Sequence, residues 1–323
     1  MGAVADVVAL IVAAFASATT SLGMREAPTS ELVWAKVGSA ATALSQAFRA
    51  EDIAPPEPVM RLEKSRQMII KGGVLRLPRG FRTVNGRFDL LVHFHGSPDV
   101  LGPAMEKLDM GAALLTVNLG IGSAAYEWPY IYEGALPAMI ANVEAAVRDT
   151  KIAGASPEPR VQRVGLSSWS AGYGAVYRII AQPTAAARID AILLEDSLHA
   201  AYKTRKTREI DDVKMGPFVE FAATAMAGKK LFVMTHSAVP TDGFASTSET
   251  ALYLTDALGL EVQPADAIRG KGMHEVGRVA RGSFALTAFT GHNEAAHCDH
   301  LLQVGETLLL RLATRWRKPG PRP

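Results

Sequence analysis

The sequence predicts an α/β protein with a mostly parallel central sheet and helices on both faces. Three observations lead to this fold class. The chain has 323 residues, of which 48% are hydrophobic and 20% charged, which suits one large domain with a substantial core. From residue 88 onward, patterns typical of buried strands alternate with helical patterns, as in parallel βαβ units. Near the middle, residues 161–174 have the pattern of a strand, a sharp turn and a helix.

Residues 1–55 are predicted to form an apolar segment, an amphipathic helix at 31–48 and a proline-rich linker, all outside the main domain, which spans residues 56–323. The apolar run 7–16 has the length of a signal-peptide core, and Ala-Ser-Ala at 16–18 has the small-x-small pattern of a cleavage site. We therefore expect a secreted or periplasmic location rather than a cytoplasmic one. A packed N-terminal helix is the alternative, because no lysine or arginine precedes the run. The run is too short for a stable membrane span.

The elements of the main domain follow in order along the chain. Strands are expected at residues 59–64, 67–77, 88–94, 113–119, 161–166, 189–194, 230–234 and 283–289. Helices are expected at residues 135–149, 217–226, 248–258 and 301–316, and residues 175–180 after the turn also have a helical pattern. The strand ends bring several polar loops to the carboxyl edge of the sheet, where α/β proteins bind their ligands.

Charge and cysteine content exclude some classes of protein. The formal net charge is only +2, and no lysine or arginine cluster alternates with aromatic residues, so we expect no nucleic-acid partner. Cys298 is the single cysteine, which rules out an intrachain disulfide and leaves the redox compartment open.

One short stretch carries the strongest functional signal. Ser168-Trp169-Ser170-Ala171-Gly172 lies between a predicted strand and a predicted helix. This stretch resembles the nucleophile elbow, G-x-S-x-G, of the α/β-hydrolase family, with Ser168 in place of the first glycine. The resemblance implies the α/β-hydrolase fold, with Ser170 as the nucleophile and the N–H of Ala171 in an oxyanion hole.

The loop after residues 88–94 fits the same resemblance. His95-Gly96-Ser97 follows this strand, where α/β-hydrolases place the second N–H of the oxyanion hole. The resemblance implies that Gly96 or Ser97 supplies this N–H, and that the side chain of His95 supports the loop and contacts substrate.

Aromatic residues near the elbow are candidate substrate contacts. Tyr126 and Trp128 belong to a loop rich in glycine and aromatic residues after strand 113–119, and they could form the wall of an apolar pocket. A packed surface loop is the alternative. Trp169, beside the nucleophile, is a further candidate, because polyester hydrolases often carry Trp or His at this place.

A serine nucleophile needs a histidine base, and the family order is serine, acid, histidine. Three histidines follow the last predicted strand: His292, His297 and His300. His297 is the expected base, because it stands where the loop should turn into the final helix. His292 would suit a shorter loop, and His300 would share a helical face with His297.

Two aspartates compete for the role of the acid. Asp242 follows the penultimate strand, the usual place in the family, but Thr-Asp-Gly has the composition of a turn. Asp196 ends the strand before it, where a rigid backbone would hold the carboxylate. We expect Asp196 to be the acid. Glu195, one residue earlier, should point to the opposite side of the sheet.

The resemblance implies a serine hydrolase that cleaves carboxylic esters through a Ser170–His297–Asp196 triad and an acyl-enzyme, without a metal or other cofactor. Its substrate would be a small-molecule or polymeric ester, whose identity the sequence does not indicate. Two alternatives remain open. One is a metal-dependent hydrolase that uses His93 and His95, two apart on one strand, with the histidines of the last loop. The other is an α/β-hydrolase fold used for binding without catalysis.

Overall fold

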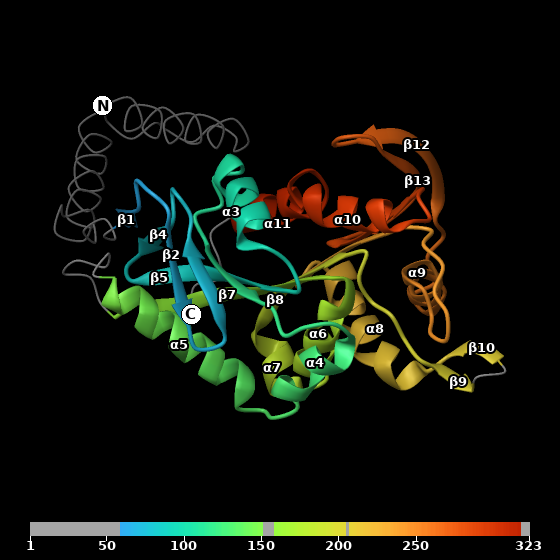
Figure 1. The fold of residues 1–323 in the computed structure, drawn as a ribbon, viewed down its shortest axis with the longest axis horizontal. Helices are drawn as coiled ribbons and strands as arrows, with labels where there is room; N and C mark the ends of the chain where they lie inside the picture. The colour runs from blue at the N-terminus through green and yellow to red at the C-terminus, as the bar shows by residue number, and fades with distance from the viewer. Residues whose placement is uncertain (1–58, 151–157, 205–206, 318–323) are drawn as a thin grey trace, which may run out of the picture. The chain divides into compact units, whose positions relative to one another are not determined.

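The computed structural model describes residues 59–150, 158–204 and 207–317 (Figure 1). The N-terminal segment, helix and linker predicted for residues 1–55 lie outside these ranges. Residues 57–323 group as one compact unit. Within the described ranges, no helix is long and apolar enough to cross a membrane.

A 12-stranded sheet and a separate two-stranded hairpin account for the described strands. The strands are β1 (Val59–Arg61), β2 (Arg66–Ile70), β3 (Gly73–Leu77), β4 (Arg82–Val84), β5 (Arg87–Phe94), β6 (Ala113–Val117), β7 (Arg160–Trp169), β8 (Ile189–Glu195), β9 (Tyr202–Thr204), β10 (Thr207–Ile210), β11 (Leu231–His236), β12 (Gln263–Arg269), β13 (Met273–Arg281) and β14 (Phe284–Phe289).

Short and long helices connect these strands. They are α3 (Pro98–Lys107), α4 (Ser123–Glu127), η2 (Trp128–Tyr130), α5 (Ala135–Asp149), η3 (Ser170–Gly172), α6 (Tyr173–Ile180), α7 (Pro183–Arg188), α8 (Asp212–Met226), α9 (Thr247–Ala257), α10 (Glu294–Leu302), η4 (Gly305–Leu309) and α11 (Leu310–Trp316).

The large sheet has the order β12-β13-β14-β11-β8-β7-β5-β6-β3-β2, with β1 and β4 beside this path. Its six central strands, from β6 to β14, run parallel, and antiparallel pairs extend it at both ends. This confirms the predicted fold class. Central strands such as β6 are buried along their whole length because helices cover both faces.

Successive residues of a central strand pack alternately into two separate hydrophobic cores. On β5, Leu90 and Val92 pack into the core beneath α5, α6 and α8, whereas Leu91 packs into the core beneath α3 and α11. Figure 1 shows these two sets of helices on opposite sides of the sheet. The carboxyl ends of the parallel strands therefore share one edge, and the loops that follow them meet there.

Several observed elements were not predicted, among them α3, β4, α7 and the hairpin β9–β10, and two further differences concern the end of the chain. The last helix begins at Glu294 rather than 301, because the Asn293 side chain accepts a hydrogen bond from Ala296 N at 2.9 Å and caps it. This helical region also contains the π-helical turn η4. The hairpin β12–β13 was not predicted at all, although β13 alternates between buried and exposed residues as an edge ribbon does.

Candidate active site

Ser170 lies in a strained turn between β7 and α6. Its φ angle is 50°, in the left-handed region that non-glycine residues seldom adopt. The turn continues into η3 and then α6. Strain of this kind is concentrated at functional sites, and a sharp strand-to-helix turn is what exposes the serine of a nucleophile elbow.

The small residues around Ser170 are required by close packing. A Cβ at Gly172 would lie 2.3 Å from the Phe94 carbonyl oxygen on β5. Ser168, in place of the first glycine of the motif, is fully buried, and its Oγ lies 2.9 Å from Ser197 Oγ. The Ser197 hydroxyl in turn donates to the Ser170 carbonyl at 2.8 Å. A serine is therefore accommodated at position 168 because its hydroxyl has a partner there.

Asp196 and His297 form a hydrogen-bonded pair beside this turn. His297 Nδ1 lies 2.7 Å from Asp196 Oδ2. The Asp196 carboxylate is buried and also accepts bonds from Ser237 N (2.8 Å), Ser237 Oγ (2.7 Å) and Thr247 Oγ1 (2.5 Å). Burial alone would favour the neutral acid, but the bond from His297, the nearby His300 and the other donors lower the pKa of Asp196 below its ordinary value.

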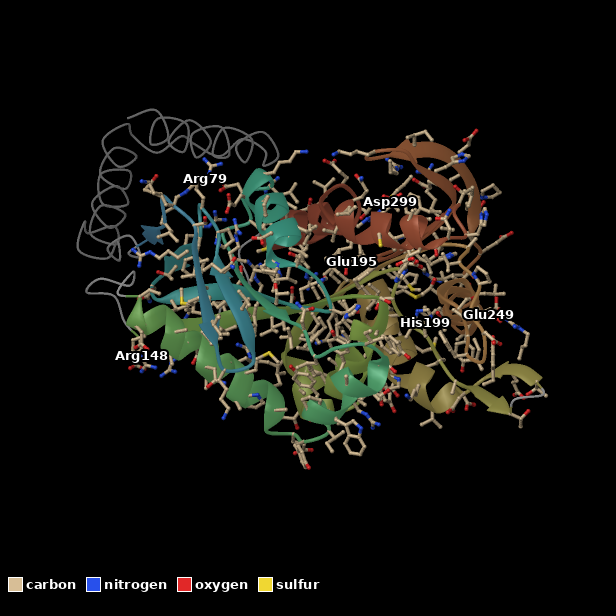
Figure 2. All side chains as sticks on the ribbon, in the orientation of Figure 1. Arg79, Arg148, Glu195, His199, Glu249 and Asp299 are labelled. Atoms are coloured by element: carbon tan, nitrogen blue, oxygen red, sulfur yellow. The ribbon has the colours of Figure 1, made fainter. Side chains whose placement is uncertain are left out.

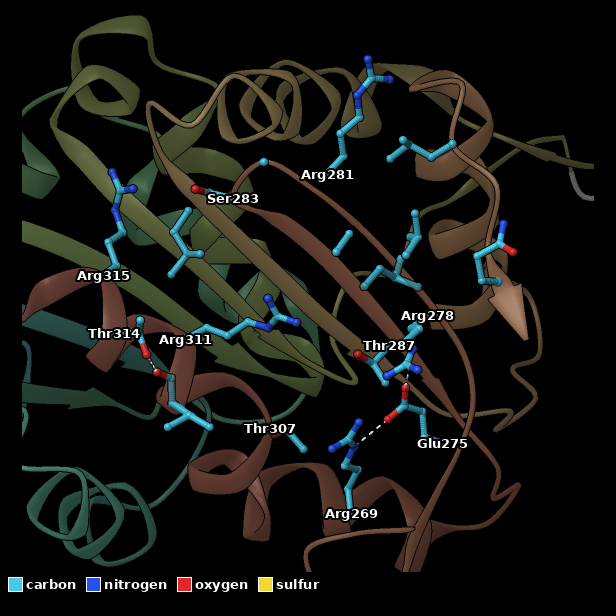
Figure 3. Close-up of a pocket in the computed structure, with 18 of the residues that line it drawn as sticks. Arg269, Glu275, Arg278, Arg281, Ser283, Thr287, Thr307, Arg311, Thr314 and Arg315 are labelled. Carbon is cyan, nitrogen blue, oxygen red and sulfur yellow. Dashed lines mark hydrogen bonds and ion pairs between the residues drawn. The ribbon is translucent and has the colours of Figure 1, made fainter. Parts of the chain in front are cut away.

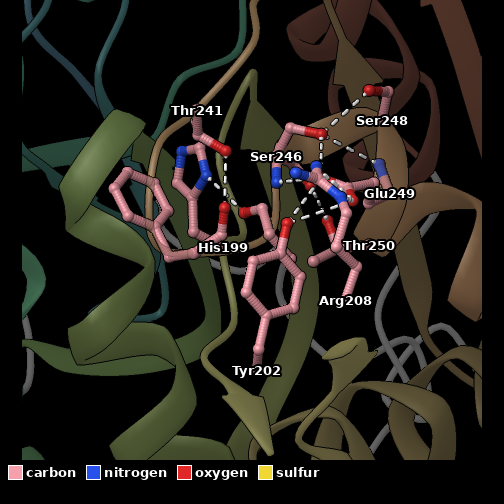
Figure 4. A network of polar contacts seen from close by, with 10 residues as sticks. His199, Tyr202, Arg208, Thr241, Ser246, Ser248, Glu249 and Thr250 are labelled. Atoms are coloured by element: carbon pink, nitrogen blue, oxygen red, sulfur yellow. Dashed lines mark hydrogen bonds and ion pairs between the residues drawn. The ribbon is translucent and has the colours of Figure 1, made fainter. Parts of the chain in front are cut away.

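A second network of polar contacts holds the start of α9, the helix whose first residue is Thr247. Figure 4 shows this network around Ser246 and Glu249. Ser246 and Glu249 form a reciprocal capping box at the start of α9. Glu249 also accepts bonds from Arg208 at 2.7 Å and from the Tyr202 hydroxyl at 3.1 Å. Burial opposes ionisation, yet these bonds lower the pKa of Glu249 to about 2. The hairpin β9–β10 thus fixes the start of α9, from which Thr247 reaches the buried carboxylate.

The other candidates for acid and base lie elsewhere. Asp242 and His292 have exposed side chains, and neither forms an ion pair or hydrogen bond within the described ranges. His300 is buried, and its Nδ1 lies 2.8 Å from Thr235 Oγ1. The structure therefore places His297, and not His292 or His300, against Asp196.

Trp169 positions the His297 ring. The two rings stack with centroids 4.8 Å apart and planes at 28°, and Trp169 Nε1 donates to the His297 carbonyl oxygen at 3.0 Å. In the described part of the chain, the His297 side chain bonds to Asp196 and not to Ser170. Such bonds often tighten only when substrate binds, so the Ser170–His297 pairing stays a prediction.

The oxyanion-hole prediction needs one correction. Gly96 N donates to Asn118 Oδ1 at 2.9 Å, and Asn118 Nδ2 donates to the Gly96 carbonyl at 2.7 Å. The N–H of Gly96 is therefore occupied by a side chain that locks the loop. Ser97 N is left as the predicted donor from this loop. Ala171 N stays the other predicted donor, and it lies in the first turn of η3, where helical N–H groups lack an intrahelical partner.

The sequence alone did not identify the role of Asn118. The sequence feature that could have indicated this role is the position of Asn118 directly after β6, at the carboxyl edge of the sheet.

Tyr126 is a support for His95 rather than a pocket wall, which corrects its predicted role. Its side chain is fully buried, and its hydroxyl lies 2.6 Å from His95 Nδ1 and donates to the Gly120 carbonyl. The His95 ring also stacks on Trp169, with centroids 5.1 Å apart and planes at 13°. Burial and the nearby His297 lower the pKa of His95. Trp128 is 69% exposed in η2 and stays a predicted substrate contact.

Three further aromatic residues gather near the elbow and were missed by the sequence analysis. The His199 ring contacts Tyr173 at 5.7 Å and Phe244 at 5.2 Å between centroids. Burial lowers the pKa of His199; the charge of Asp196 acts to raise this pKa, and that of His297 acts to lower it. Its position three residues after Asp196, past the same strand end, was the signal that could have identified it (Figure 2).

His93 and His95 do not converge on a common point. His93 is fully buried, with Nδ1 2.9 Å from Ser167 Oγ, and that hydroxyl donates to Glu195 at 2.7 Å. Burial lowers the pKa of His93 to about 3 and raises that of Glu195, labelled in the interior in Figure 2, well above its ordinary value. Among the described residues, no group of three or more His, Cys, Asp or Glu side chains is arranged to hold a metal ion.

Comparisons with known proteins found no matching family model and no matching curated protein. Among solved structures, the chain is similar to the siderophore hydrolase EstB from Aspergillus nidulans, with 14% identity, 81% of this chain and 98% of that chain covered, and a TM-score of 0.41. It is also similar to LpqC, a poly(3-hydroxybutyrate) depolymerase from Bordetella parapertussis, with 15% identity, coverage of 75% and 87%, and a TM-score of 0.37.

A third similar structure is an acylaminoacyl peptidase from Pyrococcus horikoshii, with 12% identity and a TM-score of 0.35. This chain, 85% of which is covered, spans 41% of the peptidase. Similarity this low says nothing of substrate, so the site has to be understood from its own geometry. In the arrangement of its sheet and helices, and in the turn that carries Ser170, the chain has the α/β-hydrolase fold.

Proposed function

We propose that this protein is a serine hydrolase that cleaves carboxylic esters through an acyl-enzyme intermediate. The observation that carries the proposal is the hydrogen bond of 2.7 Å between His297 and the buried Asp196 carboxylate, beside a serine held at a φ angle of 50°. A carboxylate on Nδ1 orients the imidazole and favours the tautomer whose Nε2 can accept a proton.

The proposed reaction has two halves. Ser170 Oγ attacks the ester carbonyl carbon while its proton passes to His297 Nε2, and the N–H groups of Ala171 and Ser97 stabilise the oxyanion. The alcohol then leaves with the proton from His297, and the acyl group remains on Ser170. A water molecule attacks this acyl-enzyme with His297 again as the base, which releases the acid and restores the serine.

Loss of one residue should separate this proposal from its alternatives. A fluorophosphonate probe should label the wild-type protein and not Ser170→Ala, while the control Ser168→Ala should still be labelled. Full labelling of Ser170→Ala would contradict the assignment of the nucleophile. A protein that is never labelled but loses turnover with a chelator would be a metal-dependent hydrolase, and one with neither property would favour a binding function.

The acyl preference can be measured with the same variants. We expect p-nitrophenyl esters of increasing chain length to be hydrolysed by the wild type and not by Ser170→Ala. Hydrolysis of p-nitroanilide amides at a comparable rate would instead favour a peptidase. The aromatic groups around Trp169 and His199 are the surfaces that an acyl or alcohol group would meet in this proposal.

A further inference from the structure

A groove with a volume of about 1110 Å³ lies along β14, between the edge hairpin β12–β13 and the helical segments η4 and α11 (Figure 3). Neither the elbow nor the Asp196–His297 pair is part of its lining. The groove is larger than a single small anion needs, since pockets for whole drug-sized ligands span about 300–1,000 Å³. It is therefore a separate candidate binding site.

Arginine dominates the charge of this groove. Five arginines and three glutamates line it, and no aspartate or lysine does: the charged residues are Glu261, Arg269, Glu275, Arg278, Arg281, Glu306, Arg311 and Arg315. Glu275 is buried and paired with Arg269 at 2.6 Å and with Arg278 at 3.7 Å. One carboxylate thus serves two guanidinium groups, which leaves positive charge uncompensated at this end.

Two of the arginines have no acidic partner at all. Arg281 and Arg311 are exposed, and neither forms an ion pair with any residue that the structure describes. Arg315 differs, because Asp190 neutralises it through two bonds of 2.9 and 2.7 Å. Figure 3 shows Arg311 extending from α11 across the middle of the groove, with Arg281 at the end opposite Arg269.

The floor of the groove adds a hydroxyl between two guanidinium groups. Thr287 on β14 is the direct partner of Arg278 on β13, so their side chains lie on the same face of the sheet. Arg311 approaches this face from the helix that covers it (Figure 3). The Thr287 hydroxyl has no hydrogen-bond partner within the described ranges. The strand and the helix thus both present hydrogen-bond donors to the groove, and of its two arginines named here only Arg278 faces a carboxylate, that of Glu275 at 3.7 Å.

Three donors that approach from different directions suit a tetrahedral anion better than a planar one. A carboxylate is satisfied by one guanidinium fork in its plane, whereas a phosphate offers oxygens in several directions. Arg281 and the Ser283 hydroxyl extend the same chemistry to the far end of the groove. We propose that this groove binds a ligand with several linked phosphate groups, at a site independent of the proposed ester hydrolysis.

Titration of the full chain with inorganic tripolyphosphate in a calorimeter tests the proposal. We expect one site whose affinity falls as sodium chloride is added. Arg311→Gln should weaken binding at least tenfold, and Arg278→Gln/Arg311→Gln should weaken it further. The control Arg317→Gln, which follows α11 outside the groove, should bind within twofold of wild type. Because Arg311 pairs with no described residue, its replacement should leave the melting temperature unchanged.

The other outcomes are equally informative. No binding by the wild type, or equal binding by the double variant, would overturn the site. Citrate that binds more tightly than tripolyphosphate would overturn the phosphate class, and orthophosphate that binds as tightly would overturn the requirement for linked groups. Nucleoside triphosphate compared with tripolyphosphate distinguishes an organic from an inorganic source. Ser170→Ala should bind as wild type does, and loss of binding there would place the ligand in the active site instead.

Discussion

The hydroxyl of Ser167 should stabilise the fold far more than its small size suggests. It bridges two fully buried side chains, with His93 Nδ1 at 2.9 Å and Glu195 Oε1 at 2.7 Å. Ser167→Ala would leave both atoms without this partner. An unsatisfied buried polar group costs about 1–3 kcal/mol, so the expected loss in the free energy of unfolding is about 2–6 kcal/mol.

The neighbouring residue provides a matched control. Ser168 is equally buried, but among the residues that the structure describes its hydroxyl bonds only to Ser197 Oγ, which keeps its own bond to the Ser170 carbonyl. Ser168→Ala should therefore cost about 0.5–1.5 kcal/mol, the usual net value of one hydrogen bond. The two substitutions remove the same atom from the same strand, and they differ in the number of groups left unpaired.

Urea denaturation at pH 7, followed by circular dichroism, measures both losses. The slope of the free energy against urea concentration should stay unchanged, so that the midpoints report stability alone. Equal losses for the two variants would refute the reasoning. That result would mean that His93 and Glu195, now 3.8 Å apart between Nδ1 and Oε2, close into a direct bond at little cost.

Three more predictions follow from the same geometry. Asp196→Asn should lower kcat by several orders of magnitude and Asp242→Asn should leave it within twofold, as ester turnover would show; a loss confined to Asp242→Asn would reassign the acid. Gly172→Ala should fail to fold or should lose activity, because its Cβ would lie 2.3 Å from a backbone oxygen of β5; a soluble, fully active variant would contradict this packing. On acidification below pH 6.5, His93, whose burial lowers its folded pKa to about 3, destabilises the fold, because the unfolded imidazole takes up a proton that the folded one does not. Glu195, whose burial raises its pKa in the fold, has the opposite effect, so the two contributions oppose each other. Glu195→Gln removes the contribution of Glu195, so its stability should fall on acidification more steeply than that of the wild type; parallel pH profiles would refute a raised pKa of Glu195.

Local patterns in the sequence were sufficient for the fold class and for the turn at Ser170. Buried strands read as continuous apolar runs because both faces of a parallel sheet are covered, and residues 189–194 and 230–234 show this directly. The elbow was equally visible, since small residues, one serine and a following helix lie within eleven consecutive residues. Features of this kind depend on neighbours along the chain.

Edge elements were harder to predict. The hairpin β12–β13 is only half buried, so its apolar pattern is weak, and its pairing with β14 depends on residues that follow it in the chain. The arginines of the groove were visible in the sequence as scattered charges. Only the packing of α11 over β14 places Arg311 and Arg278 in the same groove.

The choice among equivalent side chains was decided by the tertiary structure. Asp196 and Asp242 carry the same carboxylate, and the three histidines of the last loop carry the same imidazole. Their positions in the sequence permit several acid–base pairings. The strand β8 and the cap of α10 bring Asp196 and His297 to 2.7 Å. Likewise, the sequence cannot show that Asn118 occupies the N–H of Gly96 or that Tyr126 turns inward to His95. Such contacts join residues from different strands, and their distances depend on the packing of the whole sheet. The sequence by itself determined the buried central strands and their order along the chain, because those patterns depend only on neighbouring residues.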